Sequence, residues 1–194
     1  MLHGDQHQFT APARRPHVPG HHRLRRSRLD VTDYHSIQAA VDRVLEDSGR
    51  IDVLVNNAGI VTYGPVECYR DDEVSEIFET NVTGVIRVIR AVLPTMRTQC
   101  SGRIINISSV SGVWTWPFLG IYAASKHALE AVSDALHFEL IPYNIQVVLI
   151  ESGDFQTEIE NNMLFPESTK LRDDPLRVST RDGIQPIGRP IGIA

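Results

Sequence analysis

IDVLVNNAG, at residues 51–59, joins a run of apolar residues to a polar turn. Such a run, bounded by turn residues, is typical of a strand that is buried on both faces of a parallel sheet. Two more strand patterns occur at residues 103–109 and 145–150, and helical patterns separate the strands at residues 37–45, 71–96 and 122–140. Because helices alternate with apolar strands, the sequence predicts βαβ units and an α/β fold with a parallel sheet.

The first helical pattern has recognisable ends. A short strand is expected to end at residues 30–33, and Asp33 or Ser36 is expected to cap the helix that follows. Gly49 comes directly after the periodic residues and is expected to close the helix.

Tyr122 and Lys126 form a pair four residues apart in the stretch YAASK, and Ser109 lies thirteen residues before the tyrosine. Positions i and i+4 share one face of a helix, so the phenol and the ammonium are expected side by side. A nearby positive charge favours the phenolate and lowers the pKa of a tyrosine from its usual value near 10. With the Ser109 hydroxyl, this set suits proton exchange with an alcohol or ketone, paired with hydride transfer. The alternative is a solvated helix face.

In this order and at this spacing, these elements resemble the short-chain dehydrogenase/reductase family over residues 29–160. The resemblance implies a Rossmann-like, doubly wound parallel sheet. It also implies that Tyr122 is the general acid/base, that Lys126 lowers the pKa of the tyrosine and binds the nicotinamide ribose, and that Ser109 steadies the reacting oxygen. Asn81 would hold a water in a proton relay. The competing interpretation of Asn81 is a polar residue that bonds locally on a helix.

The resemblance implies NAD or NADP as the cofactor, bound at the carboxyl ends of the strands. Asn57, Ala58 and Gly59 would lie against its adenosine half, although a simple strand-to-loop turn explains them too. Asp30 would bond the adenine amino group, with Val31 beside it. A helix-capping aspartate is the alternative for Asp30.

The turn after the last strand departs from the family in one position. Gly153 and Thr157 match residues that hold the nicotinamide end of the cofactor, in addition to Tyr122 and Lys126. Ser152 replaces the proline of the family, which relaxes the backbone there. We expect this change to weaken the nicotinamide site without abolishing it.

The glycine-rich Thr-Gly-x-x-x-Gly-x-Gly motif of the family does not precede Asp30, where only Gly4 and Gly20 occur. This motif receives the pyrophosphate at a helix N-terminus. The sheet is therefore expected to be N-terminally incomplete, with residues 51–55 as an open edge strand. A wrongly chosen start or a frame change would produce this pattern. Weak or absent cofactor binding is expected. The alternative to an enzyme is a truncated, catalytically silent remnant that acts as a binding or dimerisation module.

Composition and pattern divide the chain into three segments. Residues 1–28 hold six arginines and five histidines without an apolar period, and are expected to form an irregular basic tail. Residues 29–160 would be the catalytic core, and residues 161–194 a substrate lid and C-terminal segment. No carboxylate or cysteine stands near His17, His21 and His22 at ligand spacing, so no metal site is expected there.

Composition also limits the partners. Residues 29–194 hold 13 basic and 23 acidic residues, and this acidic body argues against nucleic acid as the main partner. The chain has no run of 18 apolar residues, so no membrane span is expected. Cys68 and Cys100 make no disulfide framework and fit a reducing cytosol, which favours a cytoplasmic location. The resemblance implies a homo-oligomer that pairs through the helices at residues 72–96 and 122–140.

The expected substrate is a small-molecule alcohol or ketone. Apolar residues at 113, 114 and 116–119 lie where the family places its substrate wall, and those at 163–165 would form an apolar lid. The segment at 137–157 also resembles the steroid- and retinol-acting branch. These features favour a bulky apolar substrate, although the same aromatic residues also suit a core.

Overall fold

Three parallel strands form the sheet of the computed structural model, which describes residues 29–153 and 163–167. In the order β1-β2-β3, the strands are β1 (Val53–Asn56), β2 (Gly102–Ser109) and β3 (Ile145–Ser152). Both pairings are parallel, with Leu54 opposite Ile104 and Ile104 opposite Val147. The predicted parallel α/β sheet is confirmed, and all three strands point their carboxyl ends to the same edge.

Helix α1 (Tyr34–Ser48) has the ends that its sequence predicts. The Asp33 side chain accepts a hydrogen bond from the His35 backbone N–H at 2.9 Å, and Gly49 ends the helix with a φ of 69°. The predicted strand before Asp33 is wrong, because these residues form a turn. Asp30 closes this turn by accepting bonds from the backbone N–H and the hydroxyl of Thr32. Asp33, and not Asp30, is therefore the helix cap.

The predicted helix at residues 71–96 is interrupted near its middle. It consists of α2 (Asp71–Phe78), a π-helical segment (Glu79–Gly84) and α3 (Val85–Gln99). A π-helical turn inside an α-helix is rare and is frequently found at functional sites. Asn81 lies in this segment and is only 1% exposed.

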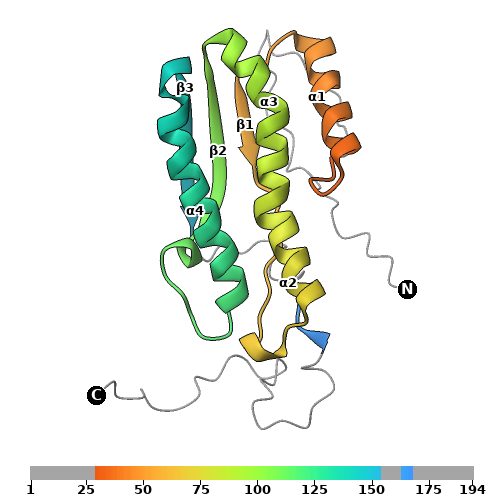
Figure 1. Cartoon of the computed structure of the whole chain (residues 1–194), viewed down its shortest axis with the longest axis vertical. Coiled ribbons are helices and arrows are strands. Elements are labelled where there is room, and N and C mark those ends of the chain that lie inside the picture. The colour runs from red at the N-terminus through yellow and green to blue at the C-terminus, as the bar shows by residue number, and fades with distance from the viewer. Residues whose placement is uncertain (1–28, 154–162, 168–194) are drawn as a thin grey trace, which may run out of the picture.

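Helices α1, α3 and α4 (Gly120–Leu140) lie on one face of the sheet (Figure 1). The main core forms on this face, where Ile104 packs with Met96 and Leu129. On the opposite face Val53 and Val55 are each 52% exposed, so the expected burial of β1 on both faces is wrong. Among the described residues β1 is an edge strand, as the sequence predicts.

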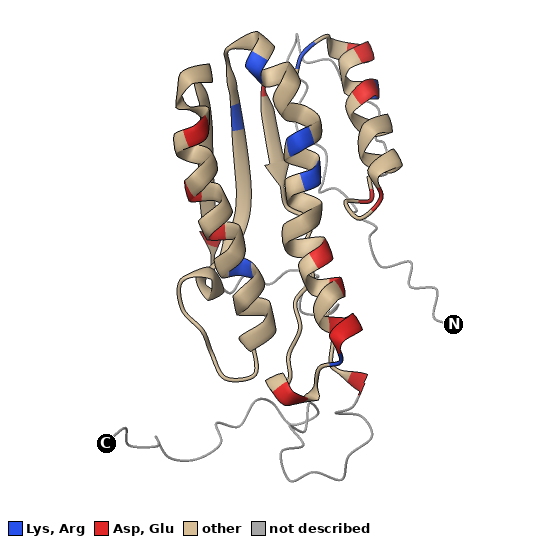
Figure 2. Ribbon diagram, in the orientation of Figure 1, with Lys and Arg blue, Asp and Glu red and all other residues tan. Residues whose placement is uncertain are grey.

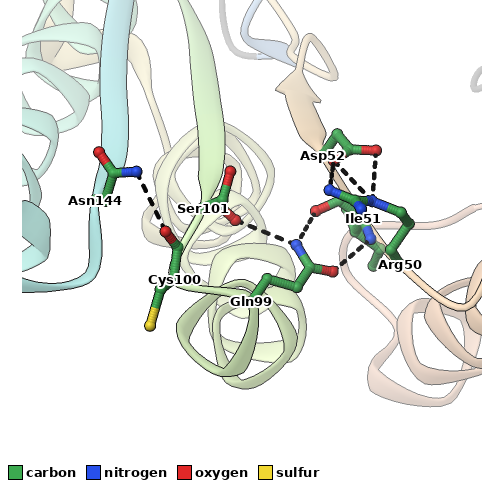
Figure 3. A network of polar contacts seen from close by, with 7 residues as sticks. All are labelled: Arg50, Ile51, Asp52, Gln99, Cys100, Ser101 and Asn144. Atoms are coloured by element: carbon green, nitrogen blue, oxygen red, sulfur yellow. Dashed lines mark hydrogen bonds and ion pairs between the residues drawn. The ribbon is translucent and has the colours of Figure 1, made fainter.

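Polar side chains connect the segments that precede the strands, at the amino-terminal edge of the sheet (Figure 3). Gln99 accepts from the Ile51 backbone N–H at 3.0 Å and donates to the Ile51 carbonyl at 2.8 Å. Asn144 donates to the Cys100 carbonyl at 3.2 Å. These bonds link the chain before β1 to the end of α3 and the start of β3, so they fix the sheet without occupying its carboxyl edge.

Three short 3-10 helices complete the described elements: Val66–Cys68, Val110–Gly112 and Ile141–Tyr143. Acidic residues lie mainly on α1, α2 and α4, and basic residues lie mainly on α3 and near the strands (Figure 2). Within the described ranges, no helix is long and apolar enough to cross a membrane.

Candidate active site

Three of the predicted catalytic residues meet where β2 ends and α4 begins. Ser109 is the last residue of β2, and Tyr122 and Lys126 lie in the first two turns of α4. The side chain of Ser109 lies close enough to the Tyr122 phenol to favour its ionised form, and it accepts a hydrogen bond from the Ser111 backbone N–H at 3.1 Å. Tyr122 is 8% exposed and Lys126 6%, so the alternative of a solvated helix face is wrong.

The pKa of Tyr122 is raised, and not lowered as the sequence predicts. Burial raises the pKa of Tyr122 above its ordinary value, and the Ser109 side chain opposes that effect only in part. The Lys126 ammonium lies 5.8 Å from the centre of the Tyr122 ring. The expected lowering of the tyrosine pKa is therefore wrong in the absence of a ligand, because desolvation of the phenolate dominates.

Lys126 is the buried cation of the site. Its ammonium donates one hydrogen bond to the Ile107 carbonyl at 2.9 Å. Burial lowers the pKa of Lys126 to about 8, and the carboxylate of Glu130 opposes this effect. An ammonium has three N–H donors, and within the described part of the chain this one makes a hydrogen bond with only one of them. This donor set fits the neighbouring hydroxyls of a nucleotide ribose.

Asn81 bonds across the fold and not along its own helix. Its side-chain oxygen accepts from the Ile60 backbone N–H at 2.8 Å, and its amide donates to the Ile60 carbonyl at 2.9 Å. The amide also donates to Ser125 Oγ at 3.0 Å, and Ser125 donates to the Tyr122 carbonyl. Asn81 thus joins the loop after β1 to α4.

The residues after β1 reach the same place. A Cβ atom added to Gly59 would lie 3.7 Å from the Lys126 ammonium and 3.4 Å from Asn81 Oδ1. Gly59 therefore lies directly beside the lysine and Asn81 at the carboxyl edge of the sheet. Asn57 and Ala58 connect β1 to this position.

The other predicted cofactor residues are less closely grouped. Gly153 follows β3 at the same edge of the sheet. Val31 packs beside α1 and α3, where its side chain fills the space above Gly84. Asp30 holds the turn before α1, so both residues have structural roles already. Thr157 lies outside the described residues, as do the histidines of the N-terminal segment.

Apolar and aromatic side chains line the region beside α4. The Tyr63 ring lies 5.5 Å from the Phe118 ring and 6.4 Å from the Phe165 ring. Segment 163–167 is held there by a parallel bridge between Thr62 and Leu164. Trp114 and Trp116 lie just before Phe118 in the sequence, and both are exposed. The segment expected to be a lid therefore lies against the loop after β1.

Sequence reasoning missed three residues near the lysine: Ser108, Gly112 and Glu130. Glu130 follows Lys126 by four residues on α4, and the same spacing rule that paired Tyr122 with Lys126 would have found it. Ser108 and Gly112 carry no local pattern, because only the folded chain brings them to Glu130.

Comparison with known proteins identifies the family of the chain. A family model described as short chain dehydrogenase matches residues 17–166. The chain is 43% identical to 3-ketodihydrosphingosine reductase of Bacteroides thetaiotaomicron over 146 residues, which are 75% of this chain and 54% of that protein. It is 41% identical to human 17-beta-hydroxysteroid dehydrogenase type 1 over 147 residues, which are 75% of this chain and 44% of that protein. The chain spans about half the length of these curated relatives.

Solved structures give the same answer. A short-chain dehydrogenase from Streptomyces avermitilis superimposes with a TM-score of 0.67 at 40% identity, covering 71% of this chain and 52% of that one. Other similar structures hold NAD or NADP, which confirms the expected cofactor class among the proteins of this fold. The parallel sheet, the Tyr122 site and the family match all point to one conclusion: the chain belongs to the short-chain dehydrogenase family.

Proposed function

We propose that this chain is an NAD(P)-dependent oxidoreductase that interconverts an alcohol and a ketone or aldehyde, with Tyr122 as general acid/base. The observation that carries the proposal is the convergence of the Tyr122 phenol, the Ser109 hydroxyl and the Lys126 ammonium in a buried site. The nicotinamide, when bound, supplies or accepts the hydride. Asn57, Ala58, Gly59 and Gly153 are the proposed contacts of the cofactor, together with Asp30, Val31 and Thr157.

In this mechanism the protein handles the proton. A substrate oxygen placed beside Ser109 accepts a hydrogen bond from its hydroxyl and exchanges a proton with Tyr122 Oη. Burial raises the pKa of the phenol, so the neutral form is the resting state and is ready to donate during ketone reduction. For alcohol oxidation the phenolate must form, and the Lys126 ammonium favours it electrostatically.

Lys126 links the proton chemistry to cofactor binding. The ammonium has donors left for ribose hydroxyls, and Gly59 lies directly beside it. Asn81 is proposed to continue the path from the lysine to solvent through a bound water. This role is supported by its burial beside the lysine, where Oδ1 accepts one bond from the Ile60 N–H and keeps a second lone pair for a water.

For the substrate we propose a bulky apolar alcohol or ketone. The aromatic group of Tyr63, Phe118 and Phe165 lies beside the start of α4 and supports this class. Two of the similar proteins are named for 3-ketodihydrosphingosine and for 17-beta-hydroxysteroids. A higher kcat/KM for a long-chain or steroid ketone than for a sugar ketone is the expected result, and the reverse order would contradict the apolar substrate.

We also propose that the protein is a cytoplasmic homo-oligomer that pairs through α3 and α4. The exposed apolar residues at the end of α4 support such a contact, since Phe138 is 70% exposed and Ile141, in the following turn, is 60% exposed. Sedimentation of the purified chain measures the oligomeric state, and a monomer at micromolar concentration would contradict this proposal.

The decisive experiment combines cofactor titration with turnover. NADH and NADPH are titrated into the purified chain by fluorescence, and oxidation of each is then followed with an apolar ketone. Tyr122→Phe is expected to bind cofactor normally and to lower kcat by about a hundredfold or more. Tyr34→Phe, at an exposed tyrosine of α1, is the matched control and should change neither quantity.

The titration also separates the two candidate functions. Measurable affinity with turnover that depends on Tyr122 supports the enzyme. No affinity for either nucleotide supports the alternative of a catalytically silent binding or dimerisation module. Unchanged turnover in Tyr122→Phe would show that another group exchanges the proton.

A further inference from the structure

Glu130 is an unusual carboxylate within the catalytic helix. It lies one turn after Lys126 on α4, where i and i+4 side chains share a face. One of its carboxylate oxygens, Oε1, is buried and has no hydrogen-bond partner in the described part of the chain. A buried carboxylate without such a partner is unfavourable unless a positive charge is near. Lys126 provides that charge, since the two groups interact electrostatically.

The turn after β2 confines this carboxylate. A Cβ atom added to Gly112 would meet Glu130 Oε1 at 2.9 Å and Glu130 Cγ at 3.1 Å. It would also meet Ser108 Oγ at 2.7 Å. Gly112 ends the 3-10 turn that begins directly after Ser109, so this turn joins the catalytic serine to the place where the carboxylate packs. A side chain at this position would therefore have to displace the Glu130 carboxylate and the Ser108 hydroxyl.

The other neighbours of Lys126 are uncharged in the resting state. On α4 the uncharged neighbour is the Tyr122 phenol. Strand β2 contributes the Ile107 carbonyl, and the loop after β1 contributes Gly59 with the Asn81 amide behind it. Among the described residues, Glu130 is therefore the charged group that opposes the desolvation of the ammonium. Without it, burial alone would govern the charge of the lysine.

We propose that Glu130 is a positioning residue that favours the charged form of Lys126, and that Gly112 leaves the space in which its carboxylate packs for this task. The effect on catalysis rests on the proposed function, because a charged Lys126 is needed to bind ribose hydroxyls and to favour the Tyr122 phenolate. The effect on the lysine itself does not depend on turnover.

NMR titration of lysine tests this directly, because the chain contains only two lysines, Lys126 and Lys170. Side-chain signals of ¹³C-labelled lysine are followed against pH in the full chain, and Lys126→Arg assigns them. In Glu130→Gln the midpoint of Lys126 is expected to move to lower pH by about half a unit or more, and that of Lys170 to stay. Glu139→Gln, at an exposed position on the same helix, is the matched control. Equal midpoints in the two glutamine variants would overturn the proposal.

Gly112→Ala provides a second variant that keeps both charges. Its added methyl group displaces the carboxylate, so the Lys126 midpoint is expected to fall here as well. An unchanged midpoint would remove Gly112 from the proposal, and circular dichroism checks that each variant is folded. The pH profile of kcat/KM should move in the same direction as the lysine midpoint. If no variant or parent shows turnover, the proposed function fails, while the lysine midpoints still decide the role of Glu130.

Discussion

Replacing Asn81 with alanine should destabilise the protein strongly, because its side chain holds three hydrogen bonds at a position that is 1% exposed. Each net bond contributes about 0.5–1.5 kcal/mol, and the variant leaves the Ile60 N–H and carbonyl without their partners. Ile60 is only partly buried, so water can reach these groups in part. We therefore expect a loss of roughly 2–4 kcal/mol in the free energy of unfolding.

Urea denaturation followed by circular dichroism measures this loss. Asn57→Ala is the matched control, because it removes the same amide from an exposed position in the same region and should change stability by less than about 0.5 kcal/mol. Hydrogen exchange adds a local readout: the Ile60 amide should exchange faster in Asn81→Ala, since its acceptor is gone. A loss below about 1 kcal/mol, with unchanged exchange at Ile60, would refute the argument that Asn81 ties the loop after β1 to the catalytic helix.

Two further predictions concern the lysine and segment 163–167. Burial places the pKa of Lys126 at about 8 against an ordinary 10.5, so between these values the unfolded chain binds more protons and the contribution of this residue to stability rises with pH. Lys126→Met should therefore raise the free energy of unfolding by up to about 3 kcal/mol at pH 7, and by much less near pH 10.5. Urea denaturation at the two pH values measures this difference, and an equal gain at both would contradict the argument. In Gly64→Ala the new Cβ would lie 2.7 Å from two carbons of the buried Pro166 ring, so segment 163–167 should shift at a loss of about 1–3 kcal/mol. Faster exchange of the Tyr63 amide, which donates to the Leu164 carbonyl, would report the shift, and unchanged exchange would exclude it.

The sequence predicts those features of the fold that depend on local patterns. The three strands, the helix that Asp33 and Gly49 bound, and the Tyr122–Lys126 pair follow from periodicity and spacing alone. The π-helical segment could not be predicted in this way, because Asn81 there bonds to Ile60, 21 residues earlier. The tyrosine pKa was misjudged for a related reason. Spacing places a lysine beside the phenol, but it does not reveal how deeply both are buried.

Buried polar bonds outside the site explain how its parts are brought into register. Asn56 at the end of β1 donates to Asn106 of β2 at 2.8 Å, and Asn106 donates to Ser133 of α4 at 2.8 Å. All three side chains are buried, so a slip of either strand or a rotation of α4 would leave polar groups unpaired in the core. Such bonds specify one arrangement where apolar packing alone tolerates several.

This chain of bonds has a consequence for the chemistry. It fixes α4 against β2 near its middle, and the bond from the Lys126 ammonium to the Ile107 carbonyl fixes it again two turns earlier. Tyr122 lies one turn before that second bond, so its phenol is held against Ser109 by the helix as a whole. The geometry of the proton-exchanging groups thus depends on the strand–helix contacts more than on the loop that connects them. Substitutions in the exposed part of that loop, such as those at Trp114 or Trp116, should change substrate preference while the pH dependence of turnover stays the same.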